Sequence, residues 1–237
     1  MTAGTSSAEP AARVIFDVQA DAEAAAQSAA ERLAAVAAAG GHVALSGGAT
    51  PALAYRLAAL ADWSRAHVWW GDDRCVPPDD ERSNYRLAKE SLLDRVSAQP
   101  QVHRIRGELP ADEAAELYDR ELEGVVLDLA LNGLGPDGHT ASLFPGSPTL
   151  DVADRRAVAA PAGLEPFVDR VTMTIPVLNA ARSVLFLVTG GDKAEVVRRA
   201  FAGAPDPATP ASLVRSRAGT TVVILDRDAA SRLDIAS

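Results

Sequence analysis

The chain has 237 residues, a hydrophobic share of 48% and a formal net charge of -9. This length and apolar content allow a substantial core in one large domain. The negative charge argues against general attraction to nucleic acid or to an anionic membrane, because both require clustered positive charge. Any anionic ligand must therefore be held by a local site.

The start of the chain and its cysteine content bear on location. Residues 1–12 lack the basic and apolar segments of a secretory signal, and we expect a disordered tail followed by a single domain over 13–237. No run approaches the ~18 uninterrupted apolar residues of a membrane-spanning helix. Cys75 is the only cysteine, which excludes an internal disulfide. These features predict a cytoplasmic protein, and a monomer is compatible with them.

The first elements are indicated by apolar runs and capping residues. Residues 14–17 suit an edge strand, and Asp21 suits the N-cap of a helix that ends at 40–41, where two glycines follow one another. The apolar run 42–45 predicts a strand that leads into a second helix. Thr50 is expected as the N-cap of that helix and Pro51 as its first residue.

The second helix should bury one face against a sheet, because its leucines recur at spacings of four and three. These residues are Leu53, Leu57 and Leu60.

The remaining segments continue the alternation of strand and helix. Strands are expected at 67–71, 102–105, 127–131, 156–160, 170–175, 183–189 and 220–225, and helices after the N-cap Ser83, over 112–122 and over 192–201. Apolar strands that alternate with helices favour a mainly parallel sheet covered on both faces. The predicted fold class is α/β, a three-layer α/β/α arrangement around a Rossmann-like sheet.

Four polar or glycine-rich segments follow predicted strands. Ligands of open α/β sheets bind beyond the carboxyl ends of the strands, so these segments are expected to converge on one site. They are 46–48, the charged turn 72–74, 132–140 and 189–193.

Two of these segments suit an anion. Ser46, Gly47 and Gly48 precede a helix, where backbone N–H groups and the helix dipole favour negative charge, although an ordinary strand-to-helix turn explains them equally well. Lys193 follows two glycines at another strand end. Its flexible charge could reach a phosphate, or it could be a solvated lysine of a first helical turn.

The glycine-rich loop 131–148 contains the strongest candidate for proton transfer, His139. Histidine is the side chain best suited to act as a general base near neutral pH, and Asp137 could orient either its imidazole or a substrate. The segment 133–138 matches the Gly-x-Gly-x-x-Gly dinucleotide pattern. We reject that match because Pro136 leaves no room for the long helix that the pattern opens.

Other reactive residue types receive structural interpretations. His42, His67 and His103 are expected in structural roles, and Cys75 as a small packing residue without a partner base. No His or Cys ligand spacing accompanies the acidic pair at 72–73, so no metal site is expected.

Several of these motifs together resemble the 6-phosphogluconolactonase family. They are 45–51 (LSGGATP), 70–74 (WGDDR), 83–84 (SN), 137–145 (DGHTASLFP), 170–174 (RVTMT) and 189–193 (TGGDK). Related glucosamine-6-phosphate deaminases share the first loop and the Asp-Gly-His element but continue with Asn-Glu-Pro. Here 143–145 reads Leu-Phe-Pro, which favours the lactonase branch.

The resemblance implies hydrolysis of 6-phospho-D-glucono-1,5-lactone to 6-phosphogluconate, in the oxidative pentose phosphate pathway, with no metal or organic cofactor. It implies that His139 takes a proton from the attacking water while Asp137 positions the imidazole. The substrate phosphate would be held by the 46–48 turn with Lys193 and Arg170. Arg74 would contact the sugar or stabilise the oxyanion.

Two alternatives remain. A sugar-phosphate deaminase or isomerase would use a similar site. A non-catalytic sugar-phosphate sensor would bind without turnover and normally carry a DNA-binding segment, for which this chain has no basic patch.

Overall fold

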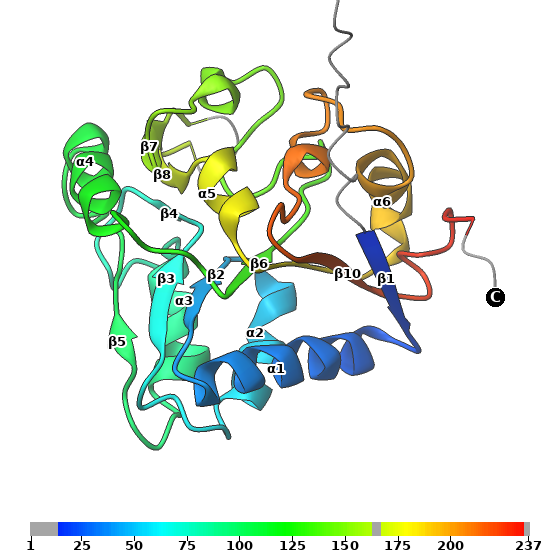
Figure 1. The fold of residues 1–237 in the computed structure, drawn as a ribbon, viewed down its shortest axis with the longest axis horizontal. Helices are drawn as coiled ribbons and strands as arrows, with labels where there is room; N and C mark the ends of the chain where they lie inside the picture. Colours follow the sequence, from blue (N-terminus) through cyan, green and yellow to red (C-terminus); the bar gives the residue numbers. More distant parts are fainter. Residues whose placement is uncertain (1–13, 163–166, 235–237) are drawn as a thin grey trace, which may run out of the picture.

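The computed structural model describes residues 14–162 and 167–234, and the predicted tail at 1–12 lies outside them. Within these residues the strands form a seven-stranded sheet and a separate three-stranded sheet (Figure 1). The prediction of a single domain over 13–237 stays a prediction. One hydrophobic cluster of buried side chains that draws on both sheets is consistent with it.

The large sheet is parallel throughout, as the apolar strands predicted. In sheet order its strands are β1 (Val14–Gln19), β10 (Thr220–Asp226), β9 (Ser183–Val188), β6 (Leu129–Asn132), β2 (His42–Leu45), β3 (His67–Trp70) and β5 (Gln101–Val102). Its central strands β6 and β9 are buried almost along their whole length, which requires cover on both faces.

Helices supply that cover and confirm the three-layer α/β/α prediction. Figure 1 shows α1 and α2 on one side of the sheet and α5 and α6 on the other. The helices are α1 (Ala22–Ala38), α2 (Ala49–Ala58), α3 (Asn84–Ala88), α4 (Ala111–Glu121), α5 (Ile175–Ala180) and α6 (Ala194–Phe201). A π-helical turn over Lys89–Leu93 extends α3, and a 3-10 turn over Gly191–Lys193 precedes α6.

Two predicted N-caps are confirmed. The Asp21 carboxylate accepts the N–H of Ala24 at 2.9 Å, and the Ser83 hydroxyl accepts the N–H of Arg86 at 3.2 Å. Each satisfies a backbone donor that the first turn of a helix leaves without a partner.

The predicted start of the second helix was wrong, and so was one of the three leucines of its predicted buried face, whereas Leu53 and Leu57 are partly buried against the core. Its N-cap is Gly48, two residues before the expected Thr50, because Gly48 takes a φ of 103° that lets the chain enter the helix there. The helix ends at Ala58, so Leu60 lies past its end and is 91% exposed. The buried side chains of the helix are Pro51, Ala54, Tyr55 and Ala58.

The charged segment 72–74 is not a simple turn. It forms β4 (Asp72–Arg74), which pairs antiparallel with β8 (Arg170–Met173), and β8 pairs with β7 (Ala157–Ala160). Figure 1 places this small sheet beside α4, on the side of the large sheet where β3 lies. A three-residue strand carries no periodic signal, and its partner lies far along the chain.

The predicted strand 102–105 is shorter than expected. The Tyr118 hydroxyl donates to the backbone carbonyl of Trp70 and accepts its N–H, both at 2.9 Å. These contacts occupy the backbone groups of β3 that a longer β5 would need, so the ladder stops at Val102. No helix in the described part of the chain is long and apolar enough to cross a membrane.

Candidate active site

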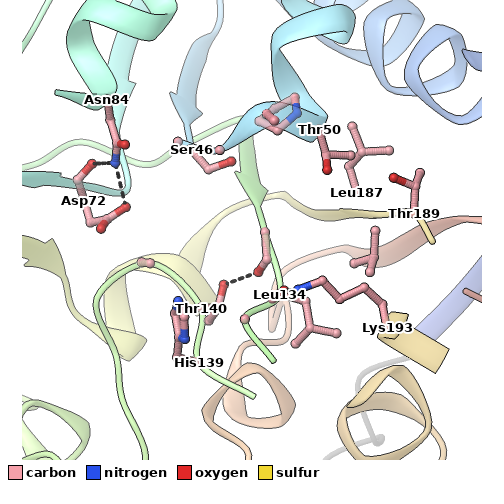
Figure 2. Close-up of a pocket in the computed structure, with 18 of the residues that line it drawn as sticks. Ser46, Thr50, Asp72, Asn84, Leu134, His139, Thr140, Leu187, Thr189 and Lys193 are labelled. Carbon is pink, nitrogen blue, oxygen red and sulfur yellow. Dashed lines mark hydrogen bonds between the residues drawn. The ribbon is translucent and has the colours of Figure 1, made fainter. Parts of the chain in front are cut away.

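The predicted strand-end segments meet at one pocket of about 310 Å³ (Figure 2). Its lining comes from the turn after β2, the loop after β6, the end of β9 with Lys193, and β4 and β8 of the small sheet. The convergence expected from the rule for open α/β sheets is therefore confirmed.

The turn after β2 presents a serine and two glycines to the pocket. The Tyr55 hydroxyl donates to the Ser46 carbonyl at 2.7 Å and accepts the Ser46 N–H at 2.9 Å, which fixes the turn. Among the described residues the buried Ser46 hydroxyl oxygen has no hydrogen-bond partner. Together with the N-terminus of α2, this arrangement offers donors to an anion.

Gly47 is required by a close approach across the pocket wall. A Cβ at this position would lie 1.8 Å from Oδ1 of Asn84, so no larger residue fits without moving Asn84. Asn84 in turn accepts a hydrogen bond from Nη1 of Arg74. The glycine therefore affects the placement of an arginine that lines the pocket.

Arg74 and Arg170 are neighbours, because they face one another in the register of β4 and β8. Arg170 is 4% exposed, and its pKa is lowered by burial and by the nearby Arg74 charge, against the opposing effect of Asp72. Both arginines line the pocket, so this wall offers two cationic side chains to an anionic ligand.

Lys193 lines the same pocket from another side. Figure 2 shows it with Leu187 and Thr189, across the pocket from Asp72 and Asn84. Its Nζ donates to the carbonyl of Leu134 at 3.1 Å, which directs the ammonium group toward the loop after β6. The pocket thus has basic groups on two sides.

His139 is held by the carboxylate predicted to orient it. Its Nδ1 lies 2.5 Å from Oδ1 of Asp137, and its backbone N–H donates to the same oxygen at 3.1 Å. Burial raises the pKa of Asp137, but the hydrogen bonds from His139 outweigh that effect and hold it below its ordinary value. A charged Asp137 favours the tautomer with a proton on Nδ1 and leaves Nε2 as a proton acceptor.

A glycine of this loop leaves space for the imidazole of His139. A Cβ on Gly135 would lie 2.0 Å from Nδ1 of His139, so the ring packs directly on the backbone of Gly135. The residues 139–147 that follow form turns and no helix, in agreement with the rejection of a dinucleotide site.

Two buried polar residues of the pocket were not predicted as site residues. Asp72 is 5% exposed and accepts hydrogen bonds from Ser142 Oγ at 2.6 Å and Asn84 Nδ2 at 3.2 Å. Asn84 also donates to the Asp72 carbonyl at 2.8 Å. In the sequence, Asn84 was marked by its place beside the N-cap Ser83 and by the motif 83–84 of the family resemblance.

Asp73 has a structural role. Its carboxylate accepts the backbone N–H groups of Arg74, Asn84 and Tyr85 at 2.7, 2.7 and 3.0 Å, which anchors the N-terminus of α3. Burial raises its pKa to about 6 despite these bonds. Within the described ranges no group of three or more His, Cys, Asp or Glu side chains is placed to hold a metal.

The other histidines lie at the opposite edge of the sheet. His42 and His67 begin β2 and β3 and stack with ring centroids 4.2 Å apart, while His103 stacks on Trp69 at 3.9 Å. Their packing confirms the predicted structural roles. Cys75 packs against the core. Burial, and to a smaller extent the negative charge of Asp169, raises the pKa of its thiol to about 11, which keeps the thiol protonated.

Fold and site together define an α/β protein with a pocket for an anionic ligand beside a carboxylate-oriented histidine. Residues 17–223 match the model of the glucosamine-6-phosphate isomerases/6-phosphogluconolactonase family, and the chain belongs to that family.

Individual relatives agree with this membership. The 6-phosphogluconolactonase of Homo sapiens is 40% identical over 188 residues, which cover 75% of this chain and 71% of the human one. The Synechocystis 6-phosphogluconolactonase is 38% identical over 207 residues, covering 81% and 85%. The solved structure of 6-phosphogluconolactonase from Trypanosoma brucei superposes with a TM-score of 0.83 at 27% identity, covering 94% of this chain and 100% of the other.

Proposed function

We propose that this chain hydrolyses 6-phospho-D-glucono-1,5-lactone to 6-phosphogluconate, the lactonase step of the oxidative pentose phosphate pathway. The observation that carries the proposal is a single pocket that combines a carboxylate-oriented imidazole with an anion-binding turn and basic side chains. The names of the human and Synechocystis relatives support the same substrate. A cytoplasmic location is part of the proposal, because phosphorylated sugars do not cross membranes unaided.

In this mechanism His139 acts as a general base and then as a general acid. Nε2 takes a proton from a water molecule while the oxygen of that water adds to the carbonyl carbon of the lactone. When the tetrahedral intermediate collapses, the bond from that carbon to the ring oxygen breaks, and Nε2 returns its proton to the departing oxygen. Asp137 holds Nδ1–H throughout and stabilises the imidazolium that forms between the two transfers.

The substrate phosphate is assigned to the Ser46, Gly47 and Gly48 turn with Lys193 and Arg170. The buried Ser46 hydroxyl without a partner and the N-terminus of α2 support this assignment, since a phosphate would accept hydrogen bonds from both. Arg74, oriented by Asn84, would contact the sugar ring or the developing oxyanion. Binding the remote phosphate would align the carbonyl with the water, so it serves catalysis as well as affinity.

A lactone-hydrolysis assay tests the proposal. The purified chain should accelerate the opening of 6-phosphogluconolactone well above the spontaneous rate, and it should release no ammonia from glucosamine 6-phosphate. Ammonia release would identify a deaminase. Binding of the lactone without any turnover would identify a sensor, and either result would refute the proposed reaction.

A further inference from the structure

Phe144 lies in the same loop as His139 and is 8% exposed. Its ring centroid is 4.8 Å from that of the His139 imidazole, with 47° between the ring planes. The guanidinium carbon of Arg170 lies 5.4 Å from the same Phe144 centroid. One aromatic ring therefore contacts both the proposed base and one of the proposed phosphate ligands.

The imidazole needs such a contact because its other restraints act at one side of the ring. Asp137 bonds to Nδ1, and Gly135 packs closest to Nδ1 and Cε1. A hydrogen bond at Nδ1 leaves the ring free to swing about that bond, which would move Nε2. The contact with Phe144 opposes this motion, and the position of Nε2 decides whether it can reach the proton of a water molecule.

The Phe144 ring also stabilises the guanidinium group of Arg170. A guanidinium group that is mostly removed from water is stabilised over an aromatic ring by the electrostatic attraction between the cation and the π electrons. Arg170 is buried in this way, at 4% exposure. The Phe144 ring thus favours one placement of this side chain at the pocket wall.

The loop that carries Phe144 is itself fixed to the strands that bear the arginines. Ser142 donates its hydroxyl to Asp72 of β4 at 2.6 Å and its N–H to Thr172 Oγ1 of β8 at 3.2 Å. Thr140 accepts the N–H of Leu143 at 3.0 Å, which closes the turn before Phe144. The ring is therefore held on a rigid support.

We infer that Phe144 is a positioning residue that sets the separation and orientation of His139 and Arg170. A phosphate bound at Arg170 would then bring the substrate carbonyl to Nε2 of His139 at a fixed distance. This inference rests on the proposed function, and it assigns a role to an aromatic residue of the motif 143–145.

The kinetic test replaces the ring by a smaller apolar side chain, with a matched control. In Phe144→Leu we expect kcat to fall about 10- to 100-fold and KM to rise, because both groups lose their alignment. Phe201→Leu is the control. Phe201 is 6% exposed, makes an edge-to-face contact with Phe186 at a centroid distance of 4.9 Å and lies under Arg215 at 4.9 Å, outside the residues that line the pocket. The Phe201→Leu variant should lose about as much thermal stability as Phe144→Leu but keep kcat and KM within about twofold of wild type.

A second readout needs no substrate. The chain has four histidines, so the ring Cε1–H signal of His139 can be assigned in an NMR spectrum by its loss in His139→Gln. We expect Phe144→Leu to shift this signal, because the ring current of Phe144 disappears, and Phe201→Leu to leave it in place.

Three results would overturn the inference: a kcat of Phe144→Leu within twofold of wild type, an equal loss in Phe201→Leu, or an unmoved His139 signal. A wild-type chain without lactonase activity would instead refute the proposed function, and the NMR comparison would still report whether the Phe144 ring lies against the imidazole.

Discussion

One carboxylate oxygen of Asp137 binds both the imidazole Nδ1 of His139, at 2.5 Å, and the backbone N–H of the same residue, at 3.1 Å. The double contact ties the Nδ1 side of the ring to the backbone of the same residue. Because Asp137 is not among the residues that line the pocket, it acts through His139 and has no expected contact with the substrate.

Replacing Asp137 should therefore affect turnover more than binding. In Asp137→Asn the side chain keeps its size but loses the charge that stabilises an imidazolium, so we expect kcat to fall about 100-fold with KM nearly unchanged. Steady-state kinetics on the phosphorylated lactone would measure this. A kcat within threefold of wild type would show that the pair has no catalytic role.

Gly135→Ala should displace the imidazole, since the new Cβ would lie 2.0 Å from Nδ1. We expect a stability loss of about 1–3 kcal/mol from overpacking, together with reduced kcat. Gly133→Ala is the matched control for stability, because a Cβ at Gly133 meets no described atom within 4 Å. Equal unfolding midpoints for the two variants would contradict the close packing of His139 on Gly135.

Lys193→Met should reduce the preference for the phosphorylated lactone over unphosphorylated glucono-lactone. A charged hydrogen bond to phosphate is worth about 1.5–3 kcal/mol, so kcat/KM for the phosphorylated substrate should fall about 10- to 100-fold. Lys89 is the other lysine of the chain and pairs with Asp94 at 2.6 Å on the surface, so Lys89→Met serves as the control. An unchanged preference in Lys193→Met would move the phosphate site elsewhere.

The stacked histidines at the far edge of the sheet predict a pH-dependent stability. Burial lowers the pKa of His42 and of His67, and the neighbouring histidines, His67 for His42 and His103 for His67, lower it further. Below the ordinary histidine pKa of about 6.5 the unfolded chain therefore binds more protons than the folded one. This contribution to the free energy of unfolding is present at neutral pH and is lost as the pH falls.

Asp73 acts in the opposite direction, because its pKa of about 6 makes the folded state bind more protons than the unfolded one between about pH 4 and 6. The histidine contribution is isolated by comparing wild type with His67→Phe, which keeps an aromatic ring in the stack. Thermal unfolding at about pH 7.5 and 5.5 should show a smaller loss on acidification in the variant. Parallel losses would exclude the histidine stack as the source.

The sequence predicted the elements that local patterns specify. Apolar runs marked the buried parallel strands, and side-chain capping at Asp21 and Ser83 was visible because an N-cap needs a particular residue type. The general rule for open sheets also predicts that Ser46, His139 and Lys193 share one pocket, and all three line it.

What the sequence could not predict depends on contacts between distant segments. The strand β4 exists because Asp72–Arg74 pairs with β8, and three residues carry no pattern of their own. The roles of Asn84 and Phe144 arise from where their side chains meet Arg74, His139 and Arg170, which no local spacing encodes. The early start of α2 after its N-cap Gly48 likewise depends on a backbone angle that a glycine permits but does not require.

The rate of His139→Gln most directly tests the central role of this residue. The variant should retain the fold and bind 6-phosphogluconate with near wild-type affinity, measured by calorimetry, because the phosphate ligands are untouched. The mechanism predicts that lactone opening in its presence is indistinguishable from the spontaneous rate. Turnover within about tenfold of wild type would contradict His139 as the general base.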